Sequence, residues 1–220
     1  MNVLLVYYTF TGQAESAVKI AAEVCNAAGH ATTVCQIDFE NPALRLKRPM
    51  SPAQVRRWTV AASKGETFPL QLEPNDVMHR SWDFIGIFSN TWQNHPAPPV
   101  RSLLALPEMQ SCLVNTPFAI YVICRRLWKN NQQIVQREAE AVGGICLGAE
   151  HFEHNGGPVG SLLRTVSYLM SAGDAVARIG GIRLPLPVYG LSGAALSRVA
   201  SFTRDMICAA DIRGQERRSA

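Results

Sequence analysis

The chain opens with NVLLVYYTFTGQA at residues 2–14, a stretch in which three kinds of local structure follow one another. The apolar and aromatic run at residues 3–8 is typical of a strand buried on both faces of a parallel sheet. A short polar loop at 9–13 ends this run. Beyond it, apolar residues recur at spacings of three and four from Ala14 to Ala28, which predicts an amphipathic helix. The stretch therefore predicts a strand, a tight loop and a helix in immediate succession.

The loop between the predicted strand and helix has the composition of an anion-binding site. Free N–H groups at the start of a helix point out of such a loop, and the helix dipole favours negative charge there. Gly12 lets the backbone approach a bound group closely, and Thr9 and Thr11 supply hydroxyl donors. These features predict a phosphate site. An ordinary strand-to-helix turn is the alternative that the residues leave open.

The loop Thr9-Phe10-Thr11-Gly12-Gln13 resembles the phosphate loop of the flavodoxin-like proteins, which hold the phosphate of FMN with a Thr/Ser-x-Thr-Gly-x-Thr/Asn pattern. The resemblance implies that this cofactor is bound by Thr9, Phe10, Thr11, Gly12, Gln13 and Ala14. Ala14 departs from the pattern, because it lacks the hydroxyl that would donate to a phosphate oxygen. The resemblance also implies a doubly wound, five-stranded parallel sheet with the strand order 2-1-3-4-5.

Four further apolar runs predict the remaining strands, at 31–38, 83–89, 117–124 and 145–152. Helical patterns separate or follow them, starting at Pro52 and covering 100–106, 129–142, 158–171 and 193–210. In the helix at 158–171, one side carries Leu162, Leu163, Val166, Leu169 and Met170. Alternating strands and helices predict an α/β fold with a parallel sheet. We expect one domain over 1–220, with insertions near 40–80 and 155–190.

Composition narrows the class of protein. With 220 residues and 47% hydrophobic residues, the chain is expected to fold around a core. No apolar run is long enough to span a membrane, and the N-terminus lacks the basic region of a signal peptide. The six cysteines form no CxxC pair, which favours reduced thiols in a cytoplasmic protein.

The charge of the chain bears on its partners. The net charge is +4, whereas dedicated electron-carrier flavodoxins are typically acidic, so the balance argues mildly against that role. Basic residues are scattered and no module of interleaved aromatic and basic residues is present, so nucleic-acid binding is not predicted.

Two more loops end predicted parallel strands and are expected to meet the first loop at one edge of the sheet. After the strand at 83–89 come Asn90, Thr91, Trp92 and Gln93. A flavin needs an apolar cover over its ring and polar groups along its edge. Trp92 is the candidate for stacking, and the three polar residues are candidates for the edge and the ribityl chain. The alternative is that Trp92 holds a proline-rich surface loop.

The strand at 117–124 is followed by the second of these loops, which contains Cys124, Arg125, Arg126 and Trp128. The arginines are candidates for pairing with flavin carbonyls, a phosphate or an anionic substrate, and equally for capping the next helix. Cys124 is interpreted as a buried thiol, because no activating partner can be named.

The residues 83–99, the run Val122-Ile123-Cys124-Arg125-Arg126-Leu127-Trp128 and the stretch up to Gly190-Leu191-Ser192 resemble one flavodoxin-like subfamily. Its members are often labelled "dialkylresorcinol condensing enzyme". A strand-Cys-Arg-x-x-Trp pattern and a tryptophan in the loop after the third strand carry the resemblance, which implies the flavin fold. A condensation activity is not inferred, because the fold supplies no evident Cys-His pair of the thiolase type.

Weaker patterns add little. His151 and His154 stand three residues apart with two glutamates nearby, and on a strand they point to opposite faces, so no metal site is predicted. For His95 a structural role is the better interpretation, and Ser192 is interpreted as a helix cap. No residue is assigned as catalytic.

The sequence thus predicts an FMN-dependent oxidoreductase that passes electrons from NAD(P)H, bound transiently, or from a partner protein to a small acceptor such as a quinone. Two alternatives stay open: a flavodoxin-type electron carrier, and a flavin-free binding module of the same fold. Quinone reductases of this fold are commonly dimers, so the resemblance implies a homodimer.

Overall fold

Five long strands form the centre of the computed structural model, which describes residues 1–171, 178–179, 182–183 and 189–219. The strands are β1 (Asn2–Tyr8), β2 (Ala31–Phe39), β4 (Phe84–Trp92), β6 (Pro117–Cys124) and β7 (Ile145–Glu153). Each coincides with one of the apolar runs in the sequence. All eight residues of β6 are buried, as expected for an inner strand of a sheet covered on both faces.

The sheet is mixed and has seven strands. Two short antiparallel strands, β3 (Leu70–Glu73) and β5 (His95–Pro96), pair with β2 and β4 respectively. The prediction of a five-stranded, all-parallel sheet of order 2-1-3-4-5 is therefore wrong in strand number, and the full order is β3-β2-β1-β4-β6-β7 with β5 beside β4. The parallel strands alone lie in the sequence β2-β1-β4-β6-β7. The additional strands have four and two residues, too few to show an alternating pattern.

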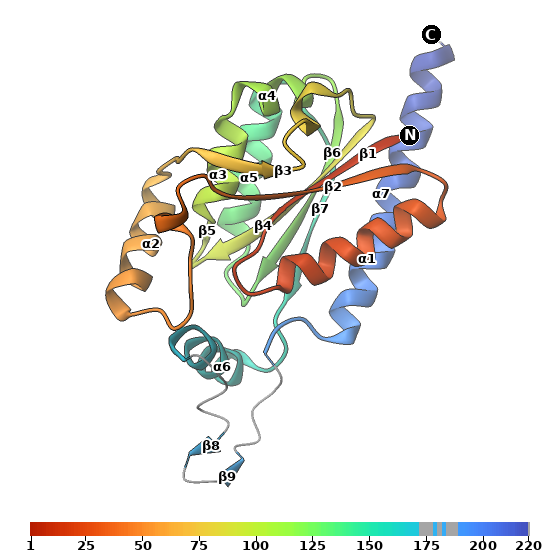
Figure 1. Ribbon diagram of the computed structural model, residues 1–220. Coiled ribbons are helices and arrows are strands. Elements are labelled where there is room, and N and C mark those ends of the chain that lie inside the picture. Colours follow the sequence, from red (N-terminus) through yellow and green to blue (C-terminus); the bar gives the residue numbers. More distant parts are fainter. Residues whose placement is uncertain (172–177, 180–181, 184–188, 220) are drawn as a thin grey trace.

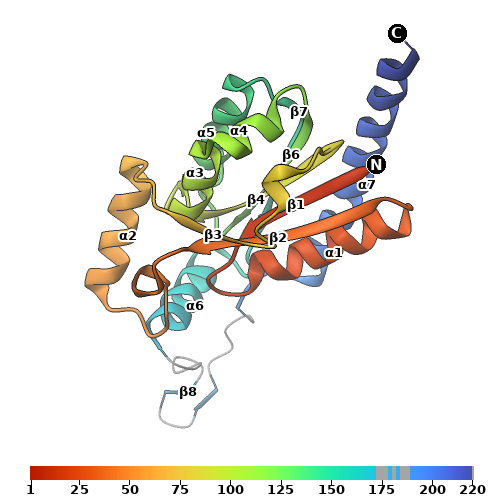
Figure 2. The same ribbon diagram turned by 45° about the horizontal axis from the view of Figure 1, so that its top comes forward.

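Helices cover both faces of the sheet (Figure 1). On one face, α1 (Gln13–Ala27) and α7 (Gly193–Ser219) pack against Phe88 and Tyr121 in one hydrophobic core. On the other face lie α3 (Pro98–Ala105), α4 (Pro107–Leu113) and α5 (Lys129–Ala141), with a separate core. Figure 2 shows the same layers from a second direction. The closing helix extends beyond its predicted end at residue 210, and α4 was not predicted.

The insertion after β2 forms its own small core beside the sheet. It contains η1 (Pro42–Leu44), α2 (Pro52–Lys64), β3 and η2 (Val77–His79). Ser51 and Gln54 form a capping box at the start of α2, so the helix begins where the Ser-Pro pair predicts. Trp58 packs on Phe39, with ring centroids 4.8 Å apart, and this contact fastens α2 to the end of β2.

The helix α6 (Pro158–Met170) presents an unusual pattern of burial. Its polar residues Ser161 and Ser167 are buried, whereas its large apolar residues are exposed: Val159, Leu162, Leu163, Val166 and Met170. The predicted apolar side of this helix thus stays largely exposed, although Leu169 packs against the core around Trp58.

After α6, the short strands β8 (Arg178–Ile179) and β9 (Ile182–Arg183) pair with each other. The other residues of the predicted 155–190 insertion between 171 and 189 lie outside the described ranges. None of the helices described is long and apolar enough to cross a membrane.

The end of β4 differs from the prediction in a way that matters for the site. The strand continues through Asn90 and Thr91 to Trp92 instead of ending at residue 89. Gln93 adopts a positive φ of 55°, and β5 returns antiparallel, with His95 opposite Trp92. Residues 90–92 are therefore held on a paired strand and not on a free loop.

A buried asparagine fixes this strand end from the helical layer. Asn131 of α5 is fully buried and accepts a hydrogen bond from Ser89 Oγ at 2.7 Å. Its Nδ2 donates to Thr91 Oγ1 at 2.8 Å. The Asn131 amide thus forms hydrogen bonds with two hydroxyls that are two residues apart on β4, and both hydroxyls therefore lie on the same face of the strand.

We predict that Asn131→Ala lowers the free energy of unfolding by about 2 kcal/mol, because two hydroxyls lose their partner. The matched control is Asn130→Ala, which removes one partly buried bond from Asn130 Nδ2 to Asn94 O. The control should cost about 0.5 kcal/mol. Urea denaturation followed by circular dichroism measures both. Equal effects of the two substitutions would show that Asn131 does not clamp the strand.

Candidate functional site

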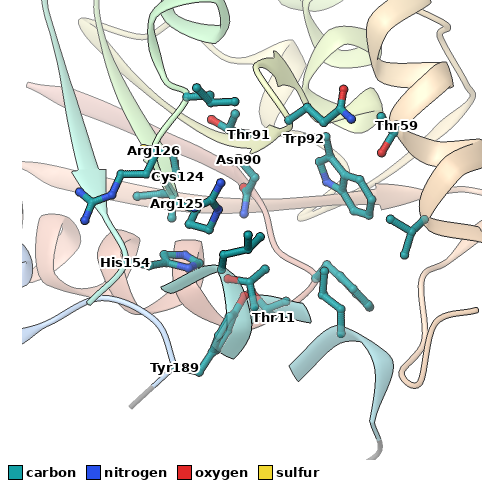
Figure 3. Close-up of a pocket in the computed structure, with 18 of the residues that line it drawn as sticks. Thr11, Thr59, Asn90, Thr91, Trp92, Cys124, Arg125, Arg126, His154 and Tyr189 are labelled. Carbon is teal, nitrogen blue, oxygen red and sulfur yellow. The ribbon is translucent and has the colours of Figure 1, made fainter. Parts of the chain in front are cut away.

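A cavity of about 330 Å³ lies beyond the carboxyl ends of β1, β4 and β6. Its walls also include residues of α2, α6 and the segments after β7 and before α7. In Figure 3, Trp92 and Thr59 lie at one end of this space, and Arg126 and His154 lie at the other. The volume falls within the range typical of small-ligand pockets, about 300–1,000 Å³.

The loop before α1 has the geometry of an anion-binding turn. Gly12 takes the left-handed conformation, with φ 78°, and stands at the N-cap of the helix. Its N–H donates to Thr9 Oγ1 at 3.0 Å, so Thr9 shapes the loop from within. The first N–H groups of α1 have no acceptor inside the helix. The helix therefore directs partial positive charge toward the loop.

The segment before α7 closes over this loop. Gln13 Oε1 accepts a hydrogen bond from the Leu191 N–H at 2.8 Å. Gly190 has a φ of 107°, which strains any other residue, and a Cβ there would also displace the same Gln13 side chain. Gln13 thus joins α1 to the start of α7 and does not line the cavity.

Tyr189 joins the cavity wall from the same segment. Its ring stacks on Tyr168 at 3.9 Å and meets His154 edge-on at 5.1 Å. Burial raises the pKa of Tyr189 to about 12, and a hydrogen bond with Thr11 opposes this rise. The phenol therefore keeps its proton at neutral pH. The sequence around Tyr189 did not predict its place in the cavity wall, since its contact with Thr11 joins positions that are 178 residues apart.

The end of β4 supplies an aromatic wall. Trp92 lies beside Phe10 of the first loop, with ring centroids 6.4 Å apart and a tilt of 32°. Both line the cavity together with Asn90, whose Oδ1 is buried and has no hydrogen-bond partner in the described part of the chain. A buried amide oxygen without a partner is costly, so Asn90 Oδ1 is available to accept a hydrogen bond from a group in the cavity.

The end of β6 supplies a thiol and two arginines. Cys124 is buried, and burial raises the pKa of its thiol to about 12, so it is not a nucleophile at neutral pH. Arg125 Nη1 donates to Pro158 O at 3.2 Å. Arg126 pairs with Glu153 and donates to Gly156 O at 2.8 Å. The arginines therefore also tie the cavity wall to the segment that leads into α6.

Three more buried polar atoms without partners belong to residues around the same cavity. Arg126 Nε, His154 Nδ1 and Thr165 Oγ1 have no partner among the described residues, and all three residues line the cavity. Burial, together with the positive charge of Arg125, lowers the pKa of His154 to about 4. His154 is therefore neutral at physiological pH and can donate or accept one hydrogen bond.

The predicted site residues divide into two groups. Those that line the cavity are Phe10, Thr11, Asn90, Thr91, Trp92, Gln93, Cys124, Arg125 and Arg126. Those that do not are Thr9, Gly12, Gln13, Ala14 and Trp128. Thr9 and Gly12 form the loop, Ala14 is buried in the core, and Trp128 stacks on His151 at 4.1 Å.

Sequence reasoning missed the parts of the wall that come from the insertions. These are Val55 and Thr59 of α2, and Leu162, Thr165 and Leu169 of α6. It also missed Leu127 and Tyr189. Within the described ranges, no group of three or more metal-ligating side chains occurs, and no metal site is assigned.

Comparison with known proteins identifies the fold. No family model matches the sequence, and no curated protein matches it. Among solved structures, the chain is similar to a flavodoxin from the domain Archaea, with a TM-score of 0.52 and 6% identity over 96% of this chain and 99% of that one. It is also similar to rubredoxin oxygen:oxidoreductase from Desulfovibrio gigas, with a TM-score of 0.52 and 9% identity, covering 96% of this chain and 36% of that one.

These likenesses show a flavodoxin-like fold, since identities of 6% and 9% carry nothing finer. The narrower resemblance to proteins labelled dialkylresorcinol condensing enzyme is supported by none of them and stays a prediction.

We predict that His154 makes the protein less stable as the pH falls from 6.5 toward 4. Over this interval His154 is protonated in the unfolded chain but stays neutral in the folded protein, because the pKa of the folded imidazole is about 4. The loss is at most about 3 kcal/mol. His154→Gln should flatten the dependence. Urea titrations at several pH values measure it, and an unchanged slope in the variant would contradict the assignment.

Proposed function

We propose that the cavity binds FMN and that the protein is an oxidoreductase. The observation that carries the proposal is the coincidence, in one cavity, of an aromatic wall and four buried polar atoms that have no partner among the described residues. The aromatic wall is Trp92 and Phe10, and the polar atoms are Asn90 Oδ1, Arg126 Nε, His154 Nδ1 and Thr165 Oγ1. A flat ring with hydrogen-bonding groups along its edge meets both needs.

The residues present fit the cofactor in all parts but one. Trp92 and Phe10 would cover the ring, and Asn90, His154 and Thr165 would serve its polar edge. The loop at 9–12 and the start of α1 would hold the phosphate through backbone N–H groups and the Thr11 hydroxyl. Ala14 gives no hydroxyl to the phosphate and is itself buried in the core. The phosphate would therefore depend more on the backbone and the helix dipole.

When bound, FMN accepts and releases electrons, and the protein supplies position, polarity and access. In one tautomer of the neutral imidazole, His154 Nδ1 donates a hydrogen bond, and in the other it accepts one, according to the partner it meets. The protonated phenol of Tyr189 keeps negative charge away from the same wall. The apolar residues Leu162 and Leu169 of α6 restrict the access of water to the cavity.

Because α6 covers part of the cavity, we favour an enzyme that reduces a small acceptor over a protein that only carries electrons. A carrier passes electrons to another protein through an exposed ring edge, whereas here Leu162, Thr165 and Leu169 line the cavity from outside the sheet. We propose a small acceptor such as a quinone, with NAD(P)H or a partner protein as the donor. A homodimer belongs to the same proposal through the resemblance to quinone reductases of this fold.

We predict that the protein, purified from cells grown with a flavin supply, is yellow and shows the two visible absorption bands of an oxidised flavin. Heat release followed by chromatography should identify the flavin as FMN. The flavin-free protein should quench FMN fluorescence on titration, because the ring stacks on Trp92. A colourless protein that leaves FMN fluorescence unchanged would refute the proposal.

Steady-state turnover with a quinone distinguishes the proposed oxidoreductase from an electron carrier. The FMN-bound protein should oxidise NAD(P)H in the presence of a soluble quinone without any added reductase. Reduction of the bound flavin by a reductase partner, with no quinone turnover, would favour the carrier instead.

We predict that Trp92→Leu weakens FMN binding about fivefold, which corresponds to about 1 kcal/mol of stacking. Trp128→Leu is the matched control, since that ring stacks on His151 and does not line the cavity. It should leave the dissociation constant within about twofold of the unsubstituted protein. A larger loss from Trp128→Leu than from Trp92→Leu would place the ring elsewhere.

A further inference from the structure

A groove of about 540 Å³ runs along α2, outside the cavity described above. One side is formed by residues of α2, and Met170 at the end of α6 contributes to the other. Val55, Thr59 and Gln93 line both the groove and the cavity. The groove is therefore a lateral extension of the cavity, and it begins at the end where Thr59 and Trp92 lie in Figure 3.

The groove has an apolar floor. Pro52, Val55, Val60 and Met170 line it, and the last two are exposed large hydrophobic residues, at 39% and 41%. Exposed apolar side chains around a hollow are typical of a site that binds an apolar group. The groove is too open to enclose a ring system, but it can receive a chain that extends from a ring bound in the cavity.

A single cation marks the groove. Arg56 is exposed and lines it, and none of the ion pairs in the described part of the chain includes this residue. Among the residues that the structure describes, no aspartate or glutamate lines the groove or the cavity. The neighbouring Arg57 differs, because its guanidinium lies 5.2 Å from the centre of the Trp58 ring and it does not line the groove. The positive charge in the groove is thus available to a ligand.

We propose that the acceptor of this protein carries an aliphatic side chain that ends in an anionic group. The ring of the acceptor enters the cavity, the chain lies on Val55, Val60 and Met170, and the anion pairs with Arg56. The inference rests on the proposed function, because it names the substrate class of the same site. The inference concerns how the acceptor binds, with its ring in the cavity and its side chain in the groove.

Three probes test the proposal by binding without turnover. They are a naphthoquinone, the same ring with a hexyl side chain, and the same ring with a hexanoate side chain. Calorimetry on the oxidised, FMN-bound protein, with no electron donor present, gives their dissociation constants. We expect the hexyl chain to tighten binding roughly tenfold over the bare ring, through burial of apolar surface. The carboxylate should add about threefold, as an exposed ion pair does.

Two substitutions on adjacent residues provide a matched pair. Arg56→Gln should remove the threefold advantage of hexanoate over hexyl and its sensitivity to salt, whereas Arg57→Gln should change neither. Val60→Asp, at an exposed position, should weaken hexanoate more than hexyl and leave the bare ring unaffected. In all three variants the visible spectrum of bound FMN should stay the same.

The outcomes separate this inference from the proposed function. If FMN binds but the side chains add no affinity, or if Arg56→Gln and Arg57→Gln weaken hexanoate equally, the groove does not bind the acceptor. If FMN does not bind, the proposed function fails, and the ranking of the three probes on the flavin-free protein still decides whether the groove selects an anionic chain.

Discussion

The parallel pairing of β1 with β4 is the constraint on which the site depends. Its register places Tyr7 beside Phe88, so the loop after β1 begins alongside the part of β4 that continues to Trp92. The pairing of β4 with β6 then sets Asn90 beside Ile123. Three strand ends are thus fixed at one edge, and the loop with Thr11, the aromatic wall with Trp92 and the turn after Cys124 come together. A slip of one residue in either pairing would turn these side chains to the opposite face.

The polarity of the cavity is determined by the side-chain atoms around it that have no hydrogen-bond partner among the described residues. Ser89 and Thr91 are satisfied by Asn131, and the arginines after β6 donate to carbonyl groups near α6. Asn90 Oδ1, Arg126 Nε, His154 Nδ1 and Thr165 Oγ1 have no partner among the described residues and belong to residues around the cavity, which gives it a few polar contacts in a largely apolar wall.

Residues that act through local sequence were predictable, and residues that act across the fold were not. The strands β1 and β6 are continuous apolar runs, and Gly12 marks its turn by its position between strand and helix, so both could be predicted. Trp92 was predicted in a loop, because β5 has only two residues and leaves no pattern, and the structure places it at the end of β4, where it lines the cavity. Tyr189 and Thr165 escaped notice, because only the return of the chain over the sheet brings them to the cavity. The exposed apolar side of α6 was also unforeseen, since a periodic pattern does not tell which side of a helix is covered.

The contact between Gln13 and residues 190–191 has a mechanical consequence. Because Leu191 is bonded to the Gln13 side chain, and a Cβ at Gly190 would displace that side chain, the starts of α1 and α7 form a shared joint. The loop at residues 9–12 precedes one of these helices, and the segment bearing Tyr189 precedes the other. A shift in the chain leading into α7 therefore displaces Gln13 and the first turn of α1, so the late part of the chain is mechanically coupled to the loop at residues 9–12.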